Sequence, residues 1–187
     1  MVVSGKKPIC ISFTSAVSPI TACALQSTVA DAANNAFDEI HLFLSTPGGT
    51  VHDGIAIYNI IRALPIPVRT YNMGNVNSIG NVLFQAGQHR ICAEASSFMF
   101  HGVGFDVHNA RMELKQLKEQ TISIENDQSL IAGIMERHTS LSREDINDLF
   151  LKMAYMSAQD AIERGIADEI RDIRLPPGLP IQQLVFQ

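Results

Sequence analysis

The stretch "EIHLFLSTPGG" (residues 39–49) contains a nearly continuous apolar run that ends at one proline and two glycines. An apolar run of this kind is typical of a parallel β-strand that is covered on both faces. Proline and glycine punctuate such runs, so a turn is expected directly after the strand. The stretch therefore predicts a buried parallel strand over 39–46 and a tight turn over 47–49.

Strand and helix patterns alternate on both sides of this stretch. Ser18 and Pro19 mark one helix start, since serine favours the N-cap position and proline the first helical position. Ser157 and Asp160 stand in capping-box relation at a later start, and Gly165 is expected to end that helix. We expect strands over 9–13, 39–46, 67–73, 89–94, 96–102 and 167–170, and helices over 18–37, 51–64, 78–86, 110–138, 142–153 and 157–165. This alternation predicts an α/β fold of repeated βαβ units with a parallel sheet.

Composition limits the class of protein. The chain has 187 residues and 46% hydrophobic content, which predicts one domain over 1–187. Lys and Arg total 14 against 19 Asp and Glu, and no basic run would follow a phosphate backbone, so no nucleic acid partner is expected. No segment is apolar for the length that a bilayer needs, and the first residues do not form a signal peptide. We therefore expect a soluble, cytoplasmic protein.

The cysteines and the tail are less informative. Cys10, Cys23 and Cys92 are far apart in the sequence, which favours neither a disulfide framework nor a zinc site. We expect neither a metal nor a cofactor. The proline-rich tail "RLPPGLPIQQLVFQ" (174–187) is expected to run irregularly over a surface or a neighbouring subunit.

Three places just past predicted strand ends could carry chemistry, because ligands of open α/β sheets bind at the carboxyl ends of the strands. Gly48 and Gly49 leave backbone N–H groups accessible, although they could serve only as a turn. Ser78 starts a predicted helix and could be its N-cap or a nucleophile. His101 ends an apolar strand, where it could be a core histidine or a general base. Together, the three describe an acyl-transfer site with nucleophile, base and oxyanion-binding loop.

Several short motifs occur in a specific order: "STPGG" (45–49), "GNVNSIGN" (74–81), "FMFHG" (98–102), "ERHTSLS" (136–142) and "YMSAQDAIERGIADEI" (155–170). In this combination the chain resembles the Clp protease proteolytic subunit family, whose fold belongs with the crotonase-like superfamily. The resemblance covers about residues 39 to 170. It implies a serine-type endopeptidase that hydrolyses peptides or unfolded polypeptide inside a homo-oligomeric ring.

The resemblance also assigns roles to individual residues. It implies that Ser78 is the nucleophile and His101 the general base, and that the backbone N–H groups of Gly49 and Ile79 form the oxyanion hole. The long helical region over about 108–140 resembles the "handle" through which two rings of the family pack face to face.

Three features depart from the family pattern. The aspartate of the catalytic triad aligns with Met153, and Asp148, about one helical turn away, is the nearest candidate third residue. Asn77 and Ser45 stand where the family has a small apolar residue and an asparagine. The leading segment that meets the ATPase in the family is missing before the first strand, so an ATPase unfoldase partner is not expected.

Three alternative functions stay open at this point. A Ser/Lys peptidase would use Lys115 or Lys118 as the base in place of His101. A catalytically weakened scaffold subunit would explain Met153. A crotonase-type acyl-CoA enzyme would use the two glycines to polarise a thioester, but it would leave Ser78 and His101 unexplained.

Overall fold

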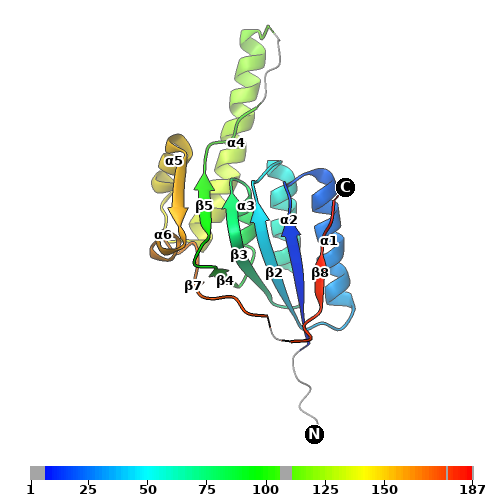
Figure 1. Cartoon of the computed structure of the whole chain (residues 1–187). Coiled ribbons are helices and arrows are strands. Elements are labelled where there is room, and N and C mark those ends of the chain that lie inside the picture. The colour runs from blue at the N-terminus through cyan, green and yellow to red at the C-terminus, as the bar shows by residue number, and fades with distance from the viewer. Residues whose placement is uncertain (1–6, 106–110, 176, 187) are drawn as a thin grey trace.

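The structure, a computed structural model, describes residues 7–105, 111–175 and 177–186. Within these residues the strands form one eight-stranded sheet with the path β6-β5-β3-β2-β1-β8, and β4 and β7 branch from β3 (Figure 1). The strands are β1 (Pro8–Thr14), β2 (Glu39–Thr46), β3 (Val68–Asn77), β4 (His89–Cys92), β5 (Ser97–Phe100), β6 (Ala154–Ser157), β7 (Glu169–Ile170) and β8 (Ile181–Gln183). The helices are α1 (Pro19–Asn34), α2 (Val51–Ala63), α3 (Gly80–Phe84), α4 (Leu114–His138), α5 (Arg143–Lys152) and α6 (Ala158–Glu163). The predicted α/β fold is confirmed.

The pairings are parallel except for that of β5 with β6, which is antiparallel. β3 is long enough to pair with two strands on the same side. Its first half pairs with β4, from Arg69 with His89 to Asn72 with Cys92, and its last residues pair with β5, from Asn75 with Ser97 to Asn77 with Met99. The carboxyl ends of β3 and β5 therefore lie next to each other.

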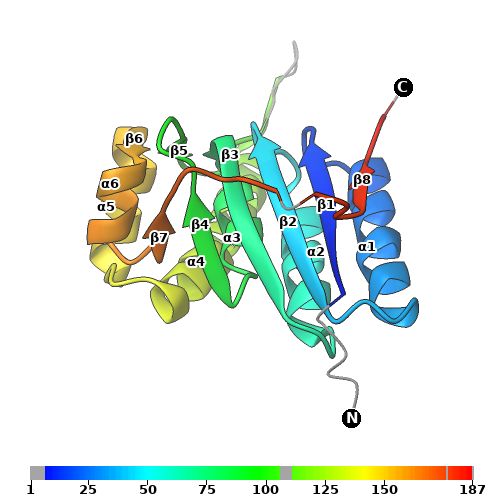
Figure 2. The same cartoon turned by 60° about the horizontal axis from the view of Figure 1, so that its bottom comes forward.

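The two faces of the sheet differ in how they are covered. Helices α1 and α2 lie against one face, and the chain between β7 and β8 crosses the other (Figure 2). Alternate residues of a strand point to opposite faces, so Ile9 and Ile11 of β1 join the main core, whereas Cys10 faces the other way. Cys10, Phe43, Tyr71 and Ile91 form a second, smaller cluster. The C-terminal segment covers this cluster through two partly buried side chains, Ile173 and Leu179.

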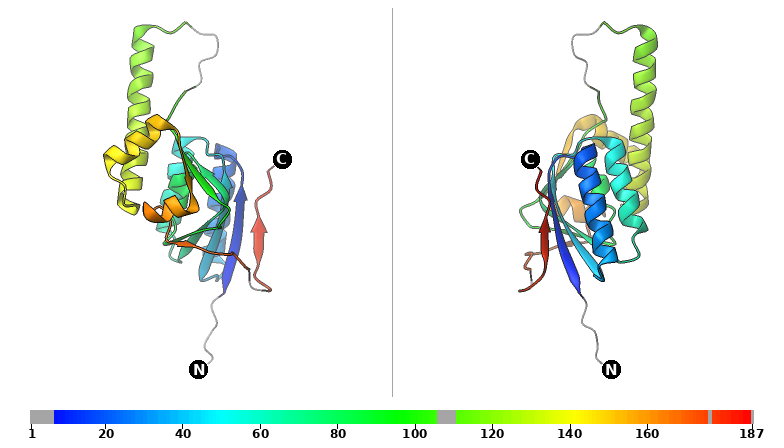
Figure 3. Two further views of the ribbon diagram at one scale, coloured as in Figure 1. Left: turned by 60° about the vertical axis from the view of Figure 1, so that its left-hand side comes forward. Right: turned by 90° about the vertical axis from the view of Figure 1, so that its right-hand side faces the viewer.

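Helix α4 projects from the body of the molecule (Figure 3). Its last turns are buried, with Ile131, Ala132, Ile134 and Met135 in the main core. Its first half is exposed and includes Leu114, Leu117 and Ile122. The helix begins at Leu114 rather than near 110, and the part of the predicted handle region over 108–110 lies outside the described residues.

Other boundaries also differ from the prediction. β3 continues to Asn77, so the helix expected over 78–86 is shorter and spans Gly80–Phe84. The helix expected over 142–153 is confirmed as α5, with Ser142 as its N-cap and Met153 as its C-cap, but the strand β6 that follows it was not predicted. The tail is not irregular throughout, because β8 pairs in parallel with β1. No helix among the described residues is long and apolar enough to cross a membrane.

Candidate active site

Ser78 lies at the sharp turn where β3 leads into α3. Its φ of 55° places it in the left-handed region, which side chains other than glycine, asparagine and aspartate rarely adopt. The Ser78 N–H donates to the carbonyl of Met99 at 2.8 Å, and the Ser78 carbonyl accepts from the N–H of Asn81 at 3.0 Å. Ser78 is not the N-cap of α3: that position is Ile79, without a side-chain capping bond. The turn thus presents the hydroxyl without using it to cap the helix.

Glycines allow the surrounding backbone to approach the turn. A Cβ atom on Gly48, which has a φ of 93°, would lie 2.7 Å from the Cβ of Ser78. A Cβ on Gly54 of α2 would lie 2.3 Å from a side-chain carbon of Ile79. The loop after β2 and the start of α2 therefore pack directly on the Ser78 turn, as only residues without a side chain allow.

Two backbone donors remain available beside the serine. The loop after β2 is fixed by bonds from Val17 N–H to the Gly48 carbonyl (2.8 Å) and from Thr50 N–H to the Val17 carbonyl (2.9 Å). Between these bonds, the N–H of Gly49 has no acceptor within the described part of the chain, and the same holds for the N–H of Ile79. Helix α2 begins at Val51, directly after the loop, and the positive end of its dipole favours negative charge nearby.

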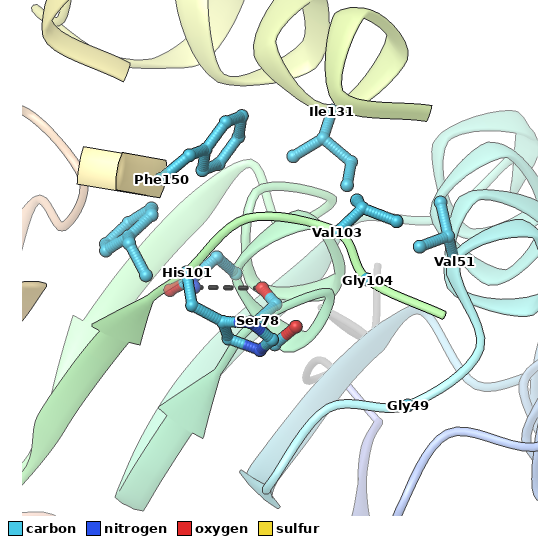
Figure 4. Close-up of a pocket in the computed structure, with 10 residues that line it drawn as sticks. Gly49, Val51, Ser78, His101, Val103, Gly104, Ile131 and Phe150 are labelled. Atoms are coloured by element: carbon cyan, nitrogen blue, oxygen red, sulfur yellow. Dashed lines mark hydrogen bonds between the residues drawn. The ribbon is translucent and has the colours of Figure 1, made fainter. Parts of the chain in front are cut away.

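His101 directly follows β5 and faces the same cavity as Ser78 (Figure 4). This cavity, the Ser78 cavity, has a volume of about 130 Å³. It is lined by Gly49, Val51, Ser78, Asn81, Phe100, His101, Val103, Gly104, Ile131 and Phe150. Among the described residues, no hydrogen bond joins the side chains of Ser78 and His101. In ligand-free active sites such bonds are often long and tighten only when substrate binds.

The structure does not place Asp148 in the cavity. Its side chain is 55% exposed on α5 and contacts the Lys152 ammonium at 2.5 Å. Met153 ends α5 with a left-handed φ of 48°, and its side chain is exposed. A backbone bond links α5 to the segment that carries His101, from the Gly102 N–H to the Phe150 carbonyl at 3.0 Å.

The two lysines of the Ser/Lys alternative lie elsewhere on the molecule. Lys115 and Lys118 belong to the exposed first half of α4, and neither lines the Ser78 cavity. The Lys115 ammonium pairs with Glu119 at 3.7 Å. In this arrangement neither lysine is available as a base for Ser78.

Three buried or half-buried titratable groups away from the Ser78 cavity have shifted pKa values. Burial lowers the pKa of His138, and the nearby positive charges of Arg62, Arg90 and Arg137 lower it further. Burial raises the pKa of Cys10 and of Cys92 to about 11. Both thiols therefore stay protonated at neutral pH and are poor nucleophiles.

Asn81 was not singled out by the sequence analysis. It is 1% exposed and lines the cavity. The signal was present, because an asparagine on the third residue after the serine is unusual in an otherwise apolar short helix.

A parallel sheet that presents a serine on a strained strand-to-helix turn, beside a histidine and free N–H groups, is the scaffold of a serine hydrolase. A model of the Clp protease family matches residues 9–174. The chain therefore belongs to the Clp protease family, and its class is that of a serine-type endopeptidase.

Individual relatives agree with this assignment. The chain is 29% identical over 144 residues to the ATP-dependent Clp protease proteolytic subunit of Deinococcus radiodurans, an alignment that covers 75% of this chain and 68% of that protein. A mutant of ClpP1 from Listeria monocytogenes has a similar structure, with a TM-score of 0.78 at 19% identity, covering 90% of this chain and 92% of that one. This second similarity shows the fold alone.

Proposed function

We propose that this serine peptidase hydrolyses peptides or unfolded polypeptide, with Ser78 as nucleophile and His101 as general base. The observation that carries the proposal is that both side chains face one cavity, the serine on a left-handed turn that does not use its hydroxyl as a helix cap. A serine hydroxyl is a weak nucleophile until a base takes its proton, and His101 is the titratable side chain that shares the cavity.

The proposed reaction follows from the groups around the cavity. Ser78 Oγ attacks the peptide carbonyl carbon while His101 takes its proton, and the carbonyl oxygen becomes an oxyanion. The N–H groups of Gly49 and Ile79 donate to this oxyanion, and each donor of this kind contributes about 3 to 4 kcal/mol to the transition state. His101 then returns the proton to the leaving amine, and water hydrolyses the acyl-enzyme.

The walls of the cavity support a substrate with an apolar side chain near the scissile bond. Most of the lining side chains are apolar, among them Val51, Phe100 and Phe150. An extended peptide that places an aliphatic or aromatic side chain here would bury apolar surface and hold its carbonyl over Ser78.

The proposal includes a homo-oligomeric ring in the cytoplasm. The exposed apolar side chains on the projecting half of α4 support assembly, because a monomer would leave them in water. The free cysteines support a reducing compartment.

The test combines peptide hydrolysis with labelling by a fluorophosphonate, which reacts with activated serines. Ser78→Ala is expected to abolish both labelling and peptide hydrolysis, a loss of about 100-fold or more from a site that lacks the triad carboxylate. His101→Ala is expected to abolish hydrolysis and to slow labelling strongly. Ser45→Ala is a matched control, since its hydroxyl lies near the same strand ends but bonds to the Asn75 side chain at 2.9 Å.

Each alternative function predicts another result. A Ser/Lys peptidase would keep its turnover in His101→Ala and lose it in Lys118→Ala. A scaffold subunit or an acyl-CoA enzyme would leave Ser78 unlabelled in the wild type. The scaffold is the alternative with structural support, because no carboxylate among the described residues lines the Ser78 cavity.

A further inference from the structure

The side chain of Asn81 connects the two strands that carry the candidate catalytic pair. Its Nδ2 donates to the carbonyl of Ser78 and to the carbonyl of Met99, both at 2.9 Å. Both acceptors are carbonyl oxygens, so the orientation of the amide is fixed by its partners. Figure 4 shows the bond to Ser78 beside the cavity.

Together with a backbone bond, these two bonds link Ser78, Asn81 and Met99 in a ring of hydrogen bonds. The Met99 carbonyl also accepts from the Ser78 N–H at 2.8 Å, so both backbone polar groups of Ser78 are tied to Met99, one directly and one through Asn81. Met99 precedes His101 by two residues on the same segment. The position of the serine turn is therefore coupled to the position of the histidine.

The other end of the same side chain has no partner. Asn81 Oδ1 is buried and forms no hydrogen bond with any described residue. A buried acceptor without a partner is unfavourable, and an alanine at this position would leave no such atom. The two donated bonds explain what the amide does there.

A left-handed serine needs support from its surroundings, because the backbone conformation is itself unfavourable. Without the amide, the Ser78 carbonyl would keep only the bond from the Asn81 N–H, within the short helix α3. The turn could then rotate relative to β5, and the Ser78 hydroxyl would move relative to His101.

We propose that Asn81 is a positioning residue, whose carboxamide holds the left-handed Ser78 turn against the β5 backbone in register with His101. The inference rests on the proposed roles of Ser78 and His101. Asn81 acts through the backbone and takes no part in proton transfer.

The test uses Asn81→Ala, which removes the amide, and Asn81→Asp, which keeps its shape but replaces the donor with an acceptor. Both are expected to lower kcat for a peptide substrate by roughly 10- to 100-fold, the usual effect of a small misplacement of a reacting group, with KM close to that of the wild type. Fluorophosphonate labelling of Ser78 should slow in parallel.

Asn72→Ala is the matched control. Asn72 is fully buried in β3, and its Nδ2 donates to the Ser97 carbonyl of β5 at 2.9 Å, but it does not line the cavity. Asn72→Ala should lower the midpoint temperature of thermal unfolding at least as much as Asn81→Ala does. It should leave kcat near the wild-type value. Wild-type kcat and labelling in both Asn81 variants, or an equal loss of kcat in Asn72→Ala, would overturn the proposal.

Crystal structures of the wild type and of Asn81→Ala separate this proposal from the proposed function. If the wild type neither hydrolyses peptide nor reacts with fluorophosphonate, the proposed function fails. The positioning role is still tested by the structures, since Ser78 is expected to leave its left-handed conformation or to lose its bond to Met99 in the variant. A Ser78 turn that is unchanged in Asn81→Ala would refute the role whatever the activity.

Discussion

Gly48 packs so closely against Ser78 that a Cβ atom at position 48 would clash with it. The Cβ of an alanine at position 48 would lie 2.7 Å from Ser78 Cβ and 2.8 Å from the Asn77 carbonyl oxygen. The φ of Gly48, 93°, is also one that side chains rarely adopt. The position of Ser78 therefore depends on the loop after β2 as well as on its own strand, β3.

We predict that Gly48→Ala displaces Ser78 and lowers kcat by roughly 100-fold, because a shift of about 1 Å at a reacting group has an effect of this size. Peptide turnover and the rate of fluorophosphonate labelling measure it. Gly74→Ala is the control, since its new Cβ would meet only the Ser45 hydroxyl, at 3.5 Å. Equal turnover in the two variants would show that the close packing at Gly48 is not needed for catalysis.

Met153 is a favourable site for adding a carboxylate. Its φ of 48° suits aspartate better than most residues, and its side chain is 58% exposed, so no core contact is lost. Because Met153 aligns with the aspartate of the family's triad, we predict that Met153→Asp raises kcat tenfold or more, up to about 10⁴-fold. A carboxylate on the far nitrogen of a catalytic histidine fixes its tautomer and stabilises its charged form.

The companion variant is Asp148→Asn. The Asp148 carboxylate is exposed and paired with Lys152, so turnover should stay close to that of the wild type. Steady-state kinetics of both variants against the wild type decide the question. A large loss in Asp148→Asn would instead identify Asp148 as the third catalytic residue.

Elements with strong local signals were predicted well from the sequence. Ser18 and Ser157 cap α1 and α6 through capping boxes, and Gly165 takes a φ of 66° just after α6. β6 and β8 were missed because a strand of three or four residues is decided by its partner strand rather than by its own pattern. That Ser78 and His101 lie at one cavity could be predicted, because both follow predicted strands whose carboxyl ends meet at the same edge of the sheet. Asn81 stands out by its residue type, but its role could not be predicted, since this depends on the carbonyl of Met99, a residue of another strand.

The C-terminal turn of α4 contains a histidine whose titration should affect stability. His138 Nε2 lies 2.7 Å from the Tyr58 hydroxyl, and burial together with Arg62, Arg90 and Arg137 lowers the pKa of His138 below its ordinary 6.5. The unfolded chain then binds this proton more tightly than the folded chain does. Protonation at low pH therefore favours unfolding.

We predict that the free energy of unfolding decreases as the pH falls from about 6.5 towards the lowered pKa of His138, with no contribution from this group above that range. His138→Gln should reduce the slope in this range, because it removes the titrating group. Urea unfolding at a series of pH values measures the slope in both proteins. Identical slopes would exclude His138 as the source of the dependence.

At the scale of the whole molecule, half of α4 has no packing partner within the described chain. Leu117 is 44% exposed and Ile122 is 66% exposed, both on the part of the helix that projects from the body. A helix with exposed aliphatic side chains is most stable when another surface covers them. The natural partner for such a helix in a homo-oligomer is the same helix of a second copy.

We predict that Leu117→Lys combined with Ile122→Lys shifts the protein towards smaller species, because each apolar side chain that fails to be buried loses about 1.5 to 3 kcal/mol. Sedimentation velocity at micromolar concentration measures the distribution of species. Glu125→Lys, an exposed charge change on the same helix, should leave it unchanged. A wild type that sediments as a stable monomer would contradict both the prediction and the proposed ring.

The pairing of β8 with β1 also has a consequence for the order of folding events. β1 and β8 come from opposite ends of the described chain, with Cys10 opposite Ile181, whereas the βαβ units are built from neighbouring segments. Contacts between distant segments form late, because the entropy of closing a long loop must first be overcome. β8 should therefore dock after the transition state. Substitutions that strengthen its contact with β1 should slow unfolding and leave the folding rate almost unchanged, so that this short strand governs the lifetime of the native state.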